Sequence, residues 1–258
     1  MFSTQNLKTQ LKENKALVGT WITLYHPSIA EMACNAGFDW IGIDLEHSVI
    51  NISEAEQLIR TINLLNKTAL VRLTSNNSDQ IKRVMDAGAT GIIVPMVETK
   101  DDVSNAANSM YYEPIGRRGV GLARAQGYGA KFKEYCKDIV SNGILVAQIE
   151  NIKAINNLDE IFSHPLLDAY MIGPYDLSSS MGIAGQFESN EFIEVVDTIN
   201  ASAKKYGVPG GVHIVEPNLD LLAKSLEGGS KFITYSVDIR IMESAYSEAM
   251  NFVLKSIK

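Results

Sequence analysis

The chain carries a series of short apolar runs that each end abruptly in charged or amide side chains. Residues 41–43 are apolar and are followed by Asp44, Glu46 and His47. The same change recurs where the runs 69–71, 144–147 and 169–173 lead to Arg72, to Gln148 and Glu150, and to Asp176. Polar chemistry at the carboxyl ends of successive apolar strands is typical of a (β/α) barrel, which builds its active site there. The pattern therefore predicts a barrel with a polar site at its rim.

Strand-length apolar runs alternate with segments of helical period, as expected for βα units around a parallel sheet. We predict eight strands, at 17–22, 38–44, 68–73, 91–95, 144–149, 168–172, 208–213 and 231–235. Helices are predicted near 27–36, 53–65, 77–87, 99–110, 151–161, 190–206, 217–228 and 239–256. Eight of each favour the α/β class and a closed (β/α)8 TIM barrel, with one domain over residues 1–258. An open doubly wound sheet is the alternative, but no strand leads into a GxGxxG or P-loop turn.

Local signals mark several element boundaries. Residues 53–56, Ser-Glu-Ala-Glu, match a capping box that would open the second helix. Glycines suited to C-terminal caps follow four helices, at Gly37, Gly88, Gly207 and Gly228. Residues 113–143 are rich in glycine and contain no predicted element. Long βα loops of this kind usually carry function, cover a site or mediate assembly.

Length and composition exclude several classes of protein. The 258 residues, 46% of them apolar, suit one barrel of roughly 250 residues. A net charge of −7 and a pI near 5.2 argue against nucleic acid or an anionic membrane as a partner. The two cysteines, Cys34 and Cys136, lack metal-type spacing and indicate a reducing compartment. The first eight residues show no signal-peptide pattern, and no run is long enough to span a bilayer. We therefore expect a cytoplasmic, soluble protein.

Glu150 and Asp176 are the candidate metal ligands. They are 26 residues apart, the length of one βα repeat, so their carboxylates should converge at the tops of adjacent strands. Two carboxylates, with water in the remaining positions, suit a hard divalent ion such as Mg²⁺ or Mn²⁺. The alternative is that each is a solvated acid at a helix N-terminus, favoured by the helix dipole.

Arg72 and His47 are the candidate catalytic residues. Arg72 ends an otherwise apolar strand, where its guanidinium could hold an anionic substrate or stabilise an enolate oxygen. A structural ion pair at the rim is the alternative. His47 follows Asp44 by three residues, which suits a general base oriented by a carboxylate. A histidine that is merely hydrogen-bonded to nearby acids remains the other interpretation.

Two absences narrow the chemistry. No lysine lies at the carboxyl end of a predicted strand, since Lys67 and Lys231 precede theirs, so a Schiff-base mechanism is not expected. The segments after the seventh and eighth strands lack the glycine-rich turns that often bind phosphate. We expect a substrate without a phosphate group.

Eight motifs that occur in order along the chain resemble those of a known family. They are Gly19-Thr-Trp21, Asp44-Leu-Glu-His47, Val71-Arg72, Lys82-Arg-Val-Met-Asp-Ala-Gly-Ala89, Val94-Pro-Met-Val97, Arg118-Gly-Val-Gly121, Gln148-Ile-Glu150 and Gly173-Pro-Tyr-Asp-Leu-Ser178. Together they resemble the HpcH/HpaI aldolase family, of the 4-hydroxy-2-oxoheptanedioate (2,4-dihydroxyhept-2-ene-1,7-dioate) aldolase type. This family belongs to the phosphoenolpyruvate/pyruvate superfamily. The resemblance extends from about residue 15 to 240.

The resemblance implies a class II pyruvate aldolase on a TIM barrel. Such an enzyme reversibly cleaves a 4-hydroxy-2-oxo acid to pyruvate and an aldehyde, through a pyruvate enolate held at a divalent ion (Mg²⁺ or Mn²⁺, with Co²⁺ as an alternative). By similarity the site residues take these roles: Glu150 and Asp176 bind the metal, Arg72 stabilises the enolate, His47 oriented by Asp44 performs acid–base catalysis, Trp21 and Gln148 line the site, and N–H groups around Tyr175 and Asp176 receive the pyruvate carboxylate. The resemblance also implies a homo-oligomer, a hexamer, with Asp86 or residues 113–143 at an interface.

Two positions depart from the family pattern. His213 lies where the family usually has a small or apolar residue, and Tyr235 is also unusual. Both are expected to border the part of the site that contacts the aldehyde half of the substrate, so the heptanedioate substrate itself does not carry over. Two alternatives remain: another lyase on the same pyruvate-enolate site, such as an oxaloacetate decarboxylase, and a non-catalytic barrel that binds a 2-oxo acid.

Overall fold

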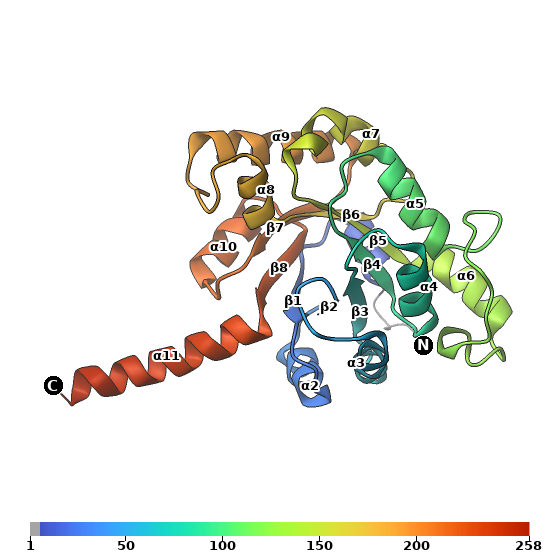
Figure 1. Cartoon of the computed structure of the whole chain (residues 1–258), viewed down its shortest axis with the longest axis horizontal. Coiled ribbons are helices and arrows are strands. Elements are labelled where there is room, and N and C mark those ends of the chain that lie inside the picture. The colour runs from blue at the N-terminus through green and yellow to red at the C-terminus, as the bar shows by residue number, and fades with distance from the viewer. Residues whose placement is uncertain (1–5, 258) are drawn as a thin grey trace.

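Eight parallel strands close into a barrel (Figure 1). The computed structural model describes residues 6–257, so residues 1–5, where part of the signal-peptide prediction falls, lie outside the described chain. The strands are β1 (Leu17–Ile22), β2 (Trp40–Asp44), β3 (Thr68–Arg72), β4 (Gly91–Val94), β5 (Ile144–Ile149), β6 (Ala169–Ile172), β7 (Gly210–Ile214) and β8 (Phe232–Val237). They pair in sequence order, and β8 pairs with β1. The predicted (β/α)8 barrel is confirmed.

Helices surround the barrel, and all but one of the helical segments predicted from the sequence are single α-helices in the structure. They are α1 (Leu7–Lys12), α2 (Pro27–Ala36), α3 (Ile52–Leu64), α4 (Ser78–Asp86), α5 (Lys100–Met110), α6 (Phe132–Asn142), α7 (Leu158–Phe162), α8 (Pro174–Ser180), α9 (Asn190–Tyr206), α10 (Leu219–Glu227) and α11 (Asp238–Ser256), with the 3₁₀ turns η1 (Arg124–Gln126) and η2 (Ile152–Asn157). The predicted helix 151–161 is instead η2 followed by α7.

The long connection 113–143 is more structured than predicted. It contains η1 and α6, and α6 buries Tyr135 and Ile139, which lie one helical turn apart. Tyr135 also receives a hydrogen bond from Arg118 Nη1 at 2.9 Å. The expectation that this segment has no element was wrong because its helix is held mainly by these tertiary contacts; no side chain caps its start.

The capping box of α3 is shifted from the predicted residues. Asn51 is the N-cap, and its Oδ1 accepts hydrogen bonds from the backbone N–H groups of Ser53 and Glu54 at 2.9 and 3.1 Å. The Glu54 carboxylate in turn accepts the N–H of Asn51 at 2.8 Å. The box therefore runs from Asn51 to Glu54, and the prediction that Ser53 opens it was wrong.

Two tryptophans fill the barrel interior. Trp40 stacks on Phe232 with ring centroids 4.5 Å apart, and Trp21 meets Trp40 edge-on at 6.0 Å. Both rings need glycine opposite them: a Cβ at Gly19 would lie 2.0 Å from the Trp40 ring, and one at Gly42 would lie 2.4 Å from Trp21. The packed interior leaves only the rim at the carboxyl ends of the strands for a site.

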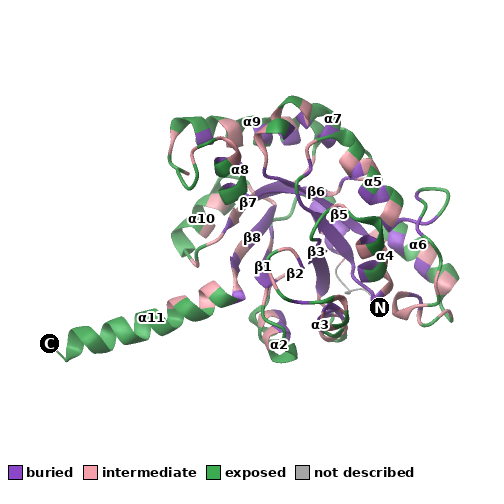
Figure 2. Cartoon of the chain, viewed as in Figure 1, coloured by how far each residue is buried: buried purple, intermediate pink, exposed green. Residues whose placement is uncertain are grey.

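A second apolar layer lies between the outside of the barrel and the helices, whose outward faces are exposed (Figure 2). The exception is α11, which extends away from the barrel (Figure 1). Its exposed apolar side chains are Ile239, Met242, Tyr246, Met250, Phe252, Val253 and Leu254. Within residues 6–257, no helix combines the length and the hydropathy that a membrane crossing requires.

Candidate active site

A buried ion pair joins the ends of β2 and β3 at the barrel rim. Asp44 and Arg72 are paired in register and are 1% and 8% exposed. Arg72 donates from Nε to Asp44 Oδ1 at 2.9 Å and from Nη2 to Oδ2 at 2.6 Å. The guanidinium also lies 4.6 Å from the centre of the Trp21 ring. Arg72 is therefore fixed on two sides, and Trp21 supports it from within the barrel.

The charges of this pair stabilise each other. Burial alone would raise the pKa of Asp44, but hydrogen bonding and the positive charge of Arg72 outweigh it, and the pKa is lowered. Burial would likewise lower the pKa of Arg72, and Asp44 reverses that effect. Both groups are charged at neutral pH, so the rim carries a permanent cation.

The predicted orientation of the His47 ring by Asp44 is wrong. The Asp44 carboxylate is occupied by Arg72, and its Oδ1 accepts the backbone N–H groups of Glu46 and His47 at 3.0 and 3.3 Å. It therefore orders the loop after β2 and makes no hydrogen bond to the His47 imidazole. The His47 side chain is 62% exposed, and its Nε2 lies 3.7 Å from Glu46 Oε2. The carboxylate nearest the ring is that of Glu46.

Glu46 is a site residue that sequence reasoning did not select. Its side chain is 15% exposed, and Oε2 lies 3.5 Å from Arg72 Nε, yet that oxygen makes no hydrogen bond to any described residue. Burial raises the pKa of Glu46 to about 7, and the charges of Asp44 and Asp176 add to the effect. The signal was its place between Asp44 and His47, in the run that first indicated the site.

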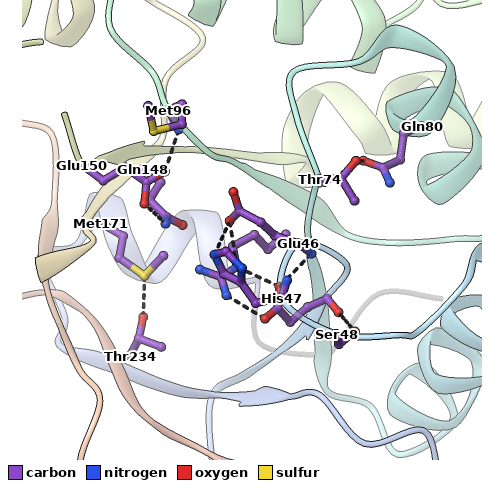
Figure 3. A network of polar contacts seen from close by, with 12 residues as sticks. Glu46, His47, Ser48, Thr74, Gln80, Met96, Gln148, Glu150, Met171 and Thr234 are labelled. Atoms are coloured by element: carbon purple, nitrogen blue, oxygen red, sulfur yellow. Dashed lines mark hydrogen bonds and ion pairs between the residues drawn. The ribbon is translucent and has the colours of Figure 1, made fainter. Parts of the chain in front are cut away.

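Glu150 follows β5 and is held by two donors on its flanks (Figure 3). Its Oε1 accepts the backbone N–H of Met96 at 2.7 Å, and its Oε2 accepts the side-chain amide of Gln148. Met96 has a φ of 52°, an unfavourable conformation for a residue with a side chain. Strained backbone of this kind clusters at functional sites, and here it directs an N–H at a buried carboxylate.

The negative charges near Glu150 affect its protonation. Burial raises the pKa of Glu150 to about 7, against the two hydrogen bonds, and the charges of Glu46 and Asp176 raise it further. Asp176 lies in the first turn of α8 and is exposed. That helix begins beside Glu150, because a Cβ at Gly173 would lie 2.6 Å from Glu150 Oε2. Glu150 therefore lies against the start of the helix that carries Asp176, the second predicted ligand.

The oxygen atoms at this point suit a hard divalent ion. The Gln148 Oε1 atom is also buried there without a hydrogen-bond partner among the described residues. Within residues 6–257, no cluster of three or more His, Cys, Asp and Glu side chains has the arrangement of a metal site. Two carboxylates with open positions remain a suitable donor set for Mg²⁺ or Mn²⁺, and a dication would offset the repulsion between the acids. The residues present fit such an ion.

The other three predicted contacts differ in their placement. Tyr175 is 49% exposed, and its ring packs edge-on against Phe187 at 4.9 Å. His213 faces the barrel interior, where its ring meets Trp21 at 6.2 Å. Tyr235 is in register with Ile214, on the outer side of the barrel wall, because neighbouring residues alternate between faces. The expectation that Tyr235 borders the site was wrong.

Comparison with known proteins agrees with this geometry. The family model described as HpcH/HpaI aldolase/citrate lyase matches residues 17–245. A hydroxypyruvate/pyruvate aldolase of Sagittula stellata is 34% identical over 92% of this chain and 93% of its own. A 4-hydroxy-2-oxovalerate aldolase of Novosphingobium aromaticivorans is 31% identical over 90% and 88%.

A solved HpcH/HpaI aldolase/citrate lyase family protein from Burkholderia cenocepacia superimposes with a TM-score of 0.91 at 27% identity, over 96% of this chain and 99% of that one. The family match covers all eight strands of the barrel and every rim residue described above. The chain is a carbon–carbon lyase and belongs to the HpcH/HpaI aldolase/citrate lyase family.

Proposed function

We propose that this protein is a divalent-metal-dependent pyruvate aldolase that cleaves a 4-hydroxy-2-oxo acid to pyruvate and an aldehyde, and catalyses the reverse condensation. The observation that carries the proposal is the rim itself: a cation fixed by a buried carboxylate shares it with Glu150 and with the helix start that carries Asp176. The named aldolase relatives act on substrates of this class. The eight strands close into one barrel, which supports a single lyase domain.

Glu150 and Asp176 would hold the divalent ion, Mg²⁺ or Mn²⁺, with Co²⁺ as an alternative. When bound, the ion would supply Lewis-acid polarisation of the 2-oxo group. Gln148 orients Glu150 through its amide. The N–H groups of Tyr175 and Asp176, in the first turn of α8, are free of intrahelical partners and would receive the substrate carboxylate.

Proton transfer falls to His47. In cleavage, its imidazole takes the proton from the C4 hydroxyl, the C4–O electrons form the aldehyde carbonyl, and the C3–C4 bond breaks. The electron pair of that bond moves into the C2–C3 bond and places negative charge on the C2 oxygen. Arg72 stabilises this oxygen as a preorganised cation, because Asp44 and Trp21 already hold it. Protonation at C3 then yields pyruvate.

Glu46 takes the orienting role that the sequence suggested for Asp44. Its Oε2 lies 3.7 Å from His47 Nε2 and has no hydrogen-bond donor among the described residues. A carboxylate at this position would orient the imidazole and stabilise its protonated form. Asp44 is then free to hold Arg72.

Exchange of the pyruvate methyl protons with D₂O, followed by NMR with and without Mn²⁺, tests the proposal. We expect exchange with Mn²⁺ and none after EDTA treatment. Arg72→Ala and Glu150→Ala should each slow turnover by at least about 100-fold, the usual effect of losing one preorganised electrostatic contact. A protein that binds pyruvate without exchange is a non-catalytic barrel. Faster release of CO₂ from oxaloacetate than cleavage of any 4-hydroxy-2-oxo acid identifies a decarboxylase.

We also propose that the chain forms a homo-oligomer, a hexamer by resemblance to the family. The support is α11, whose apolar side chains recur every three or four residues at Ile239, Met242, Tyr246, Met250 and Val253, all exposed. An apolar stripe of this length on a helix that leaves the barrel is typical of an interface. Light scattering during gel filtration should give several chain masses for the native protein, and Met250→Glu should lower that number.

A further inference from the structure

His213 is an inward-facing residue of the barrel and contacts Trp21, the ring on which the Arg72 guanidinium packs. It lies in β7, in register with Thr234, whose hydroxyl donates to the Met171 sulfur at 2.9 Å inside the barrel. Residues paired in register face the same side, so the imidazole also points inward. In the order of the closed barrel, β7 lies opposite β3, which carries Arg72.

The four odd-numbered strands each place one inward side chain near the rim, in the layered manner of these barrels. Trp21 comes from β1, Arg72 from β3, Gln148 from β5 and His213 from β7. The Trp21 ring contacts both the guanidinium, at 4.6 Å, and the imidazole, at 6.2 Å between centroids. His213 thus shares the Trp21 ring with Arg72.

The imidazole of His213 has a nitrogen with nothing to bind. Its Nε2 is buried and makes no hydrogen bond to any described residue. An unpartnered buried polar atom is energetically costly, and most buried polar atoms are hydrogen-bonded to protein or to a bound molecule such as water. Arg72 is already paired with Asp44, and the backbone of Ser236, which also lies beside the imidazole, makes no hydrogen bond to Nε2.

His213 is also uncharged. Burial lowers its pKa to about 3, and the positive charge of Arg72 contributes. A neutral imidazole offers one hydrogen bond at Nε2, as donor or acceptor, and no charge to attract a carboxylate. Such a group suits a hydroxyl, which can take either role. An aldehyde that carries a carboxylate finds no positive charge on this imidazole to bind it.

We infer that His213 binds a hydroxyl group on the aldehyde half of the substrate, so that this lyase prefers hydroxyaldehydes to alkyl or carboxylate-bearing aldehydes. The inference rests on the proposed aldolase function. That function engages the oxygens of the pyruvate half with Arg72, the acids and the first turn of α8. The unused nitrogen of His213 is therefore left for the other half.

Glycolaldehyde and propanal form the test pair, because they differ by a hydroxyl in place of a methyl group. Their kcat/KM values are measured in condensation with pyruvate and Mn²⁺, for the native enzyme, His213→Leu and His213→Asn. We expect the native enzyme to have a higher kcat/KM for glycolaldehyde than for propanal. In the Leu variant the ratio of the two values should fall at least about tenfold, since a site built to hydrogen-bond a hydroxyl discriminates strongly against its absence. The Asn variant, which keeps a neutral polar group, should retain more of the ratio. Thr234→Val is the matched control at the paired position and should leave the ratio unchanged.

Pyruvate proton exchange in D₂O tests the proposed aldolase function separately from the role of His213. Exchange at the native rate in His213→Leu, together with a lost ratio, supports the inference and shows that the variant folds. Normal exchange with an unchanged ratio overturns the role of His213 alone. Exchange that falls with the ratio places His213 on the pyruvate half and also overturns the inference. Absence of exchange in the native enzyme overturns the aldolase proposal and this inference with it.

Discussion

Replacing Asp44 by asparagine tests how firmly the Arg72 guanidinium is held. The substitution keeps the shape of the side chain but removes the charge that two Arg72 hydrogen bonds use, at 2.9 and 2.6 Å. Removing one partner of a buried ion pair typically costs about 3–5 kcal/mol, because the other charge stays buried. Glu46 Oε2, 3.5 Å from Arg72 Nε, is a second carboxylate within reach, so we expect the lower end, about 3 kcal/mol.

Urea unfolding of the metal-free protein at pH 7, followed by circular dichroism, measures this loss. The pKa of Asp44 is lowered in the fold, so its stabilising effect is complete above its unfolded pKa, about 4, and is lost as the pH falls below that value. The gap between native protein and Asp44→Asn should therefore close in acid. Asp159→Asn is the control: it removes an equally short but exposed pair with Lys205, 2.6 Å long, and should change nothing measurable.

A double variant separates stability from catalysis. Asp44→Leu with Arg72→Met replaces the pair by apolar side chains of similar size, which is often neutral or stabilising for a buried pair. It should recover most of the lost stability and yet show no pyruvate proton exchange. An Asp44→Asn protein as stable as the native one at pH 7 would refute the argument that the Asp44 charge holds Arg72.

Three further predictions follow from the same geometry. Burial raises the pKa of Glu150 to about 7, whereas in the unfolded chain a glutamate has a pKa of about 4.3. Between these two pH values the folded metal-free protein holds a proton that the unfolded chain has released. The Tm of the native protein in EDTA should therefore fall relative to that of Glu150→Gln as the pH rises from about 5 to 8; parallel curves would contradict this. Gly42→Ala would place a Cβ 2.4 Å from the Trp21 ring, so it should displace the support of Arg72 and lower exchange more than Thr234→Val does; equal rates would count against that support. Arg72→Lys keeps the charge but loses the two-point contact with Asp44, and we expect at least about a 100-fold lower turnover with folding retained; native turnover would mean that charge alone suffices.

The sequence alone determined the barrel and most of its rim. Strand length, apolar content and the helical period between runs are local properties, and eight repeats of them allow few arrangements other than a closed barrel. The polar ends of the runs identified Arg72, Glu150 and Asp176 because a buried strand rarely ends in charge without a use for it. The shift of the capping box from Ser53 to Asn51 shows the limit of local signals even at a helix start.

Only the tertiary structure decided which side chains pair. Asp44 and His47 are close in sequence, but Asp44 binds Arg72 because register places β2 beside β3 and turns both side chains inward. Glu46 then becomes the carboxylate nearest His47. Tyr235 faces outward and His213 inward for the same reason, the alternation of side chains along paired strands. Pairings of this kind depend on where neighbouring strands align, and no local pattern in the chain encodes that alignment.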